Sequence, residues 1–240
     1  MAKDRAPVPG NDAPAPSATR AEVDAFLDKA RAMSLAQPRG GARGRLIFAL
    51  DATMSRQPTW DIACTLQADM FRETAAIGGL DVQLVYYRGM SECRASSWVS
   101  DAKQLAGLME RIDCRGGHTQ IGRMLAHARK ENERQRVRAL VFVGDAMEEK
   151  LDDLCAVAGE LGLTGVPAFL FQEGDDPIAT TAFREIARLS NGAYCRFSQG
   201  SARELAELLR AVATYAAGGY AALEAAPRSS GAAKLLAQLK

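Results

Sequence analysis

The chain has 240 residues and a formal net charge of +1, with 48% hydrophobic and 25% charged residues. This length is sufficient for one large domain with a full core. A net charge so close to zero excludes a general electrostatic attraction to nucleic acid or to an anionic membrane. The longest apolar stretches, such as residues 139–143, have the length of a strand and are too short to cross a bilayer. We therefore expect that the protein contacts neither nucleic acid nor a membrane.

The N-terminal segment divides into two parts of different composition. Residues 1–20 are rich in alanine and proline and show no periodicity, which predicts a disordered tail. Prolines in this tail stand where a secretory signal peptide needs an apolar core. Residues 21–44 are predicted to form a helix over about 21–35, followed by a glycine-rich linker.

The cysteines bear on the compartment in which the protein works. There are five of them, scattered along the chain without a C-x-x-C pair. This pattern is typical of reduced thiols rather than of a disulfide framework or a zinc site. Together with the proline-rich N-terminus, it predicts a cytoplasmic protein.

From residue 45 onward, apolar runs of strand length alternate with segments of helical periodicity. Strands are predicted at 45–50, 81–87, 92–99, 137–143, 166–171 and 193–197. Helices are predicted at 58–77, 101–112, 121–135, 151–161, 178–189 and 202–215. The alternation predicts a doubly wound α/β domain over residues 45–217, with a mostly parallel six-stranded sheet and helices on both faces. The second and third strands read as a hairpin and would supply one antiparallel edge strand.

The end of the chain is predicted to lie outside this domain. Gly218 and Gly219 follow the last predicted helix and act as helix breakers. Residues 218–240 are therefore expected to be a C-terminal tail, with a short helix near 232–239.

Two of the predicted strands end in aspartate, at Asp51 and Asp145. In an open α/β sheet, ligands bind at the carboxyl ends of the strands, where the strand order reverses. Between these two strands lies a glycine-rich loop, residues 116–122, that opens a helix. All three segments offer hard oxygen donors and no soft ligand, a combination that favours Mg²⁺ or Mn²⁺.

Three motifs in this order resemble those of von Willebrand factor type A (VWA) domains. Residues 51–55 (DATMS) resemble the D-x-S-x-S motif, 116–122 (GGHTQIG) the G-G-x-T-x-x-G loop, and 142–145 (FVGD) the third, aspartate-bearing loop. The resemblance implies a Rossmann-like VWA fold and a metal-ion-dependent adhesion site (MIDAS). The implied ligands are Asp51, Thr53, Ser55, Thr119 and Asp145.

The resemblance also implies a function. Ser55 and Thr119 would give hydroxyl oxygens to Mg²⁺ or Mn²⁺, and Asp51 and Asp145 would hold bound waters or ligate directly. Thr53 replaces the usual serine but keeps the hydroxyl. Such a site binds a partner protein that supplies an Asp or Glu, and it performs no catalysis. Bacterial cytosolic relatives work beside ATPase or chaperone-like machines, which suggests the class of partner.

Two other interpretations of these motifs remain open. The hydroxyl residues could simply cap helices, since Ser and Thr satisfy free N–H groups at helix starts. Alternatively, Asp51 could be the nucleophile of a haloacid-dehalogenase-like, Mg²⁺-dependent phosphatase, with Asp145 in its acidic metal motif. Against the phosphatase, Thr53 stands where most members carry a second aspartate, and the required lysine could be assigned only to Lys130 or Lys150. The glycine-rich loop also has no role there.

Overall fold

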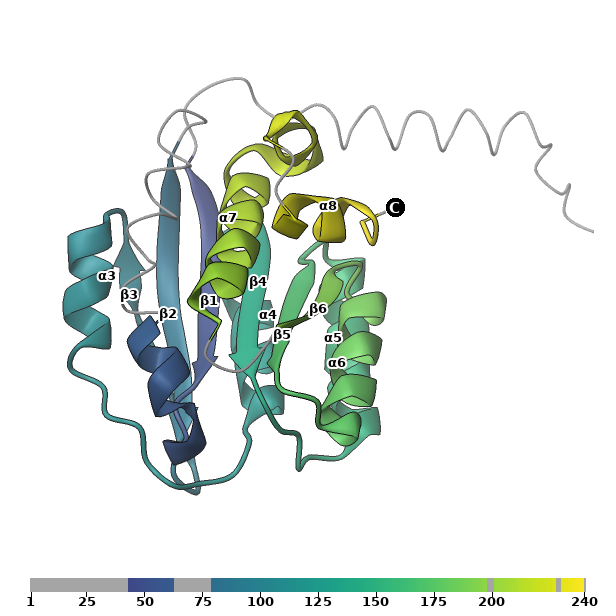
Figure 1. Cartoon of the computed structure of the whole chain (residues 1–240). Helices are drawn as coiled ribbons and strands as arrows, with labels where there is room; N and C mark the ends of the chain where they lie inside the picture. The colour runs from purple at the N-terminus through teal and green to yellow at the C-terminus, as the bar shows by residue number, and fades with distance from the viewer. Residues whose placement is uncertain (1–42, 63–78, 198–200, 228–229, 240) are drawn as a thin grey trace, which may run out of the picture. The chain divides into compact units, whose positions relative to one another are not determined.

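The computed structural model describes residues 43–62, 79–197, 201–227 and 230–239 (Figure 1). Its centre is a six-stranded sheet with the strand order β3-β2-β1-β4-β5-β6. The strands are β1 (Gly44–Asp51), β2 (Leu80–Arg88), β3 (Glu92–Val99), β4 (Ala139–Gly144), β5 (Ala168–Glu173) and β6 (Ala193–Phe197). The predicted helix at 21–35 and most of the one at 58–77 lie outside the described residues.

The strand pairing confirms the predicted sheet. β1 lies between β2 and β4 and is parallel to both. β5 and β6 continue the parallel arrangement, whereas β3 pairs with β2 in the antiparallel sense and forms one edge. The strand order therefore reverses between β1 and β4, because the chain extends the sheet on one side of β1 before it returns to the other.

Helices surround this sheet. Their bounds are η1 (Met54–Arg56), α3 (Ala102–Met109), α4 (Ile121–Arg134), α5 (Leu151–Leu163), α6 (Pro177–Leu189), α7 (Ala202–Ala225) and α8 (Ser230–Leu236). Residues 57–62 are also helical and continue from η1. No helix in the described part of the chain is both long enough and apolar enough to cross a membrane.

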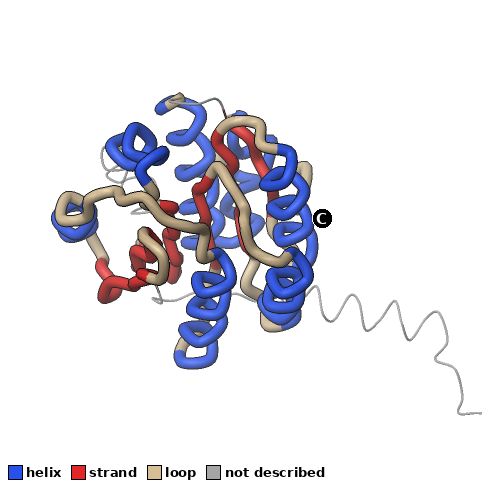
Figure 2. The backbone as a smooth tube through the Cα atoms, turned by 90° about the horizontal axis from the view of Figure 1, so that it is seen from below, coloured by secondary structure: helices blue, strands red, loops and turns tan. Residues whose placement is uncertain are grey.

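Both faces of the central strands are buried, which explains why these strands read as continuous apolar runs. On β1, Leu46, Phe48 and Leu50 belong to a core shared with α3, α7 and α8. Ile47 and Ala49 point the other way, into a core shared with α4, α5 and α6. Figure 2 shows the helices on both sides of the strands. Since the side chains of a strand alternate between faces, β1 is fixed from both sides.

The C-terminal segment differs from the prediction. α7 does not end near residue 215 but continues to Ala225, with a local break at Gly219, where φ is 73°. The described part of 218–240 is not a tail, because Leu223 and Leu235 are fully buried in the core. The side-chain amide of Gln238 also bonds to both backbone groups of Tyr194 on the edge strand β6, at 2.8 Å each. Gly219 changes the direction of the helix, and apolar side chains beyond it continue the packing.

Helix α5 offers a test of this packing with two glycines of the same helix. A Cβ at Gly162 would overlap the backbone carbonyl of Leu189, whereas a Cβ at Gly159 would meet nothing within 4 Å. Because backbone cannot move aside as a side chain can, we expect Gly162→Ala to lower the free energy of unfolding by about 1–3 kcal/mol. The control, Gly159→Ala, should raise it by about 0.5–1 kcal/mol. Urea denaturation measures both, and equal stability of the two variants would contradict the close approach of α5 to the end of α6.

Candidate metal centre

Four of the five predicted ligands form a connected set at the carboxyl ends of β1 and β4. β1 ends at Asp51, and the chain then turns into the short helix η1 (Met54–Arg56). This turn places the Thr53 hydroxyl 3.3 Å from the Ser55 hydroxyl. Ser55 in turn donates to Oδ2 of Asp145 over 3.1 Å. The turn after β1 thereby brings its hydroxyls to the aspartate that follows β4.

Asp51 is the buried end of this set, with only 2% of its surface exposed. Its Oδ1 accepts a hydrogen bond from the Thr53 N–H at 2.7 Å, and its Oδ2 accepts one from the Tyr87 hydroxyl at 3.1 Å. Tyr87 is the register partner of Asp51 on the neighbouring strand β2. Both carboxylate oxygens are therefore fixed in direction. Tyr87 was not predicted as part of the site, although its place at the end of the strand beside β1 was a usable signal.

The environment of Asp51 disfavours its charge. Burial raises the pKa of this carboxyl, and the nearby negative charge of Asp145 raises it further. The hydrogen bonds from Thr53 and the positive charge of Arg56 act in the opposite direction but do not cancel the burial. Burial and the Asp51 charge also keep the pKa of Tyr87 well above its ordinary value, so its hydroxyl remains a donor. A cation in this position would offset the unfavourable negative charge.

Thr119, the fifth predicted ligand, lies on the loop before α4 and is 8% exposed. Its hydroxyl accepts a hydrogen bond from the Glu148 N–H, and its own N–H donates to the Glu148 carboxylate, both at 3.0 Å. Within the described residues it has no hydrogen bond to the other four predicted ligands. Glu148 stands three residues after Asp145, so Thr119 is joined to the site through the loop that follows β4. Glu149 also joins these two loops, because its carboxylate accepts hydrogen bonds from the backbone N–H groups of Ile121 and Gly122 at the start of α4.

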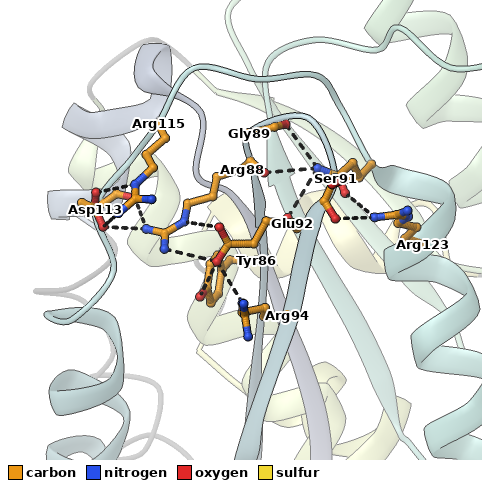
Figure 3. A network of polar contacts seen from close by, with 10 residues as sticks. Tyr86, Arg88, Gly89, Ser91, Glu92, Arg94, Asp113, Arg115 and Arg123 are labelled. Carbon is orange, nitrogen blue, oxygen red and sulfur yellow. Dashed lines mark hydrogen bonds and ion pairs between the residues drawn. The ribbon is translucent and has the colours of Figure 1, made fainter.

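The hairpin between β2 and β3 supports the same loop from the other side (Figure 3). The side-chain amide of Gln120 lies 3.3–3.4 Å from three carbonyl oxygens of this hairpin. Arg123 donates to the Ser91 carbonyl, and Arg88 reaches the carboxylate of Asp113 at 2.6 Å. The segment that carries Thr119 is thus held between the hairpin and the loop after β4.

A buried ion pair lies beside Asp145 and was not predicted from the sequence. Arg56 pairs with Glu173 at the end of β5, and its Nη1 is 3.9 Å from Oδ2 of Asp145. The Thr59 hydroxyl also donates to Glu173. Glu173 ends the strand next to β4, so its position in the sheet could have indicated that it lies near Asp145.

The donor set fits a hard divalent cation. All five groups offer oxygen, and two carboxylates of like charge lie close enough to influence each other. In the described part of the chain, no three His, Cys, Asp or Glu side chains group as a metal cluster by themselves. A metal here would therefore need the hydroxyls of Thr53, Ser55 and Thr119, as the three motifs predict.

No protein-family model and no curated protein matches the chain, but solved structures do. A von Willebrand factor type A protein from Catenulispora acidiphila is similar with a TM-score of 0.58 and 17% identity, over 73% of this chain and 43% of that one. The SpRpn10 VWA domain gives a TM-score of 0.50 and 14% identity, over 65% of this chain and 88% of that one. Proximal thread matrix protein 1 of the mussel byssus, with a zinc-occupied MIDAS motif, gives a TM-score of 0.56 and 16% identity, over 72% of this chain and 45% of that one. The chain has the VWA fold.

The geometry of the site disfavours the phosphatase, because Asp51 is buried and both of its oxygens already accept hydrogen bonds. A nucleophile must instead reach a phosphate ester. Of the two candidate lysines, Lys130 is the tenth residue of α4, roughly 14 Å along the helix from its start at the site. Lys150 precedes α5, and among the described residues no hydrogen bond or ion pair joins it to Asp51. The chain spans less than half the length of the Catenulispora and mussel structures, so the similarity concerns this domain alone.

The raised pKa of Asp51 gives a pH prediction for the metal-free protein. The unfolded chain ionises this carboxyl near its ordinary pKa of 3.8, whereas the folded protein resists ionisation. Stability from this group is therefore fully present below pH 3.8 and is lost as the pH rises through the raised folded pKa. Asp51→Asn removes the buried charge, so in chelator at pH 7 the variant should melt a few degrees above the wild type.

Thermal melting in chelator from pH 3 to pH 8 measures this difference. The difference in melting temperature should shrink toward zero at the acid end, where the wild-type carboxyl is protonated and therefore as uncharged as the asparagine. The matched control is Asp153→Asn, an exposed carboxylate in the first turn of α5, which should not raise the melting temperature. A wild type that melts above Asp51→Asn at pH 7 in chelator would show that burial does not disfavour the Asp51 charge.

Proposed function

We propose that this protein is a metal-dependent protein-binding module. Its site would hold Mg²⁺ or Mn²⁺ through Asp51, Thr53, Ser55, Thr119 and Asp145. The observation that carries the proposal is the connected series of oxygen donors at the switch point of a VWA fold, from Asp51 to Asp145. When bound, the ion supplies a positive charge with an open coordination position.

The accessibility of the site supports recognition of a partner carboxylate. Asp51 is buried, but Ser55 is exposed and the Asp145 side chain is 29% exposed. The donors therefore face solvent on one side and the core on the other. The two aspartates balance the formal charge of a divalent ion, but the hydroxyl ligands carry no charge, so an Asp or Glu of a second protein would supply the missing ligand on the open side and a charge-assisted contact with the ion.

The class of partner follows from the resemblance to bacterial VWA proteins that work beside ATPases or chaperone-like machines. We propose a partner of this class and a cytoplasmic location. In support of a reducing compartment, the four cysteines of the described segments are all free thiols. The near-neutral charge of the chain gives no reason to expect nucleic acid or membrane partners.

Metal binding is the first test of the proposal. We expect calorimetry to show Mg²⁺ or Mn²⁺ binding that is weakened at least about tenfold by Asp51→Ala, Asp145→Ala or Thr119→Ala, because each removes one oxygen ligand of the ion. Asp153→Asn serves as the control, since it removes a carboxylate outside the site and should leave the affinity unchanged. Circular dichroism confirms that each variant is folded. Equal affinity of the wild type and Asp51→Ala would refute the site.

Partner recognition is tested separately. Pull-down from cell extract should recover one or more proteins with Mg²⁺ and lose them with chelator or with Thr119→Ala, while the fold stays intact. The physical reason is that the partner carboxylate binds the ion rather than the protein surface alone. Recovery of the same proteins in both conditions, together with release of phosphate from a model ester by the purified protein, would instead support the phosphatase.

A further inference from the structure

Arg56 is the least satisfied charged group near the candidate site. It follows Ser55 directly and is 2% exposed. Among the described residues, the partners of its guanidinium are Glu173 and, at 3.9 Å, the Asp145 carboxylate, both of which lie against Nη1. Nε and Nη2 are buried and have no hydrogen-bond partner in the described part of the chain. A guanidinium offers five N–H donors, so the described residues use only part of its hydrogen-bonding capacity.

A buried cation of this kind must be stabilised by charge, since it is poorly stabilised by hydrogen bonds. Among the described residues, the negative charges that interact with it are Glu173, to which it is bonded, and the two carboxylates of the metal site. Arg56 therefore serves as their positive partner when no metal is present. Arg56 thus interacts with the site although it is not one of the ligands that the three motifs predict.

A bound divalent ion would share the Asp145 carboxylate with this guanidinium. Two positive charges separated by only one carboxylate repel each other strongly, because little water separates them. The same arginine that compensates the carboxylates in the metal-free protein must then oppose the metal.

We propose that Arg56 is a resident counter-charge of the metal site, which stabilises the metal-free state and lowers the affinity for the divalent ion. The inference rests on the proposed function and adds a residue that sets the strength of metal binding. The site would fill only at a higher metal concentration than its oxygen ligands alone would require, and the ion would exchange readily.

The competing interpretation is a purely structural clamp. Arg56 and Thr59 both bond to Glu173 and so join the segment after β1 to the end of β5. If that were the only role, damage to either side of the pair would loosen the site and weaken metal binding. The counter-charge instead predicts opposite effects, because loss of the positive charge favours the metal and loss of the negative charge disfavours it.

The experiment titrates the full chain with Mg²⁺ and Mn²⁺ in a calorimeter. Arg56→Gln keeps a donor toward Glu173 but removes the charge, and it should bind at least about tenfold more tightly than the wild type. Glu173→Gln can still accept the hydrogen bonds from Arg56 and Thr59 but removes the negative charge that is bonded to Arg56, so it should bind several-fold more weakly. Arg56→Lys retains the charge and should stay within about threefold of the wild type. In thermal melts, Arg56→Gln should be the less stable protein in chelator and should gain more than the wild type from added metal.

The outcomes separate this inference from the proposed function. A folded Arg56→Gln that binds no more tightly than a metal-binding wild type overturns the counter-charge and leaves the metal site standing. If Arg56→Gln does not fold, Glu173→Gln decides, and unchanged or tighter binding overturns the inference. Absence of metal binding in the wild type and in every folded variant overturns the proposed function and the inference together. Metal binding by Arg56→Gln at concentrations where the wild type shows none supports both.

Discussion

The burial of one carboxylate, Asp51, is the constraint on which the rest of the site depends. It lies at the end of the strand between β2 and β4, where only 2% of its surface is exposed. A charge in such a place is unfavourable unless partners compensate for it. Its partners come from three directions, with a backbone N–H from Thr53, a hydroxyl from Tyr87 and the positive charge of Arg56. The Tyr87 contact exists because β1 pairs with β2, whereas Thr53 and Arg56 lie in the turn that directly follows β1.

This arrangement also explains why the site lies on so rigid a support. β1 is packed from both faces by separate cores, so Asp51 cannot move toward solvent without disturbing one of them. The burial of apolar side chains in the two cores stabilises the domain and so offsets the unfavourable free energy of the buried charge. Folded proteins often keep a destabilising group of this kind where function requires it.

The sequence predicted the sheet and the strand-end aspartates because those features follow from local patterns. Apolar alternation identifies the strands, and Asp51 and Asp145 stand directly after them. Tyr87, Arg56 and Glu173 could not be assigned in this way, since their roles depend on which strands are neighbours. The continuation of α7 past Gly219 was also missed, because a glycine signals a break in helix geometry but not whether the chain afterwards leaves the core.

Thr119 shows how a residue can be tied to a neighbouring loop and still be available to an ion. A hydroxyl carries one proton and two lone pairs. The Glu148 N–H uses one lone pair, which leaves the other for a cation and the proton for a further acceptor. Since Glu148 also receives the Thr119 N–H, the two loops are joined by reciprocal bonds and would respond to a ligand together. Any shift of Thr119 toward an ion would therefore move the segment that follows Asp145, so the hydroxyl and the carboxylate would approach the ion as one unit.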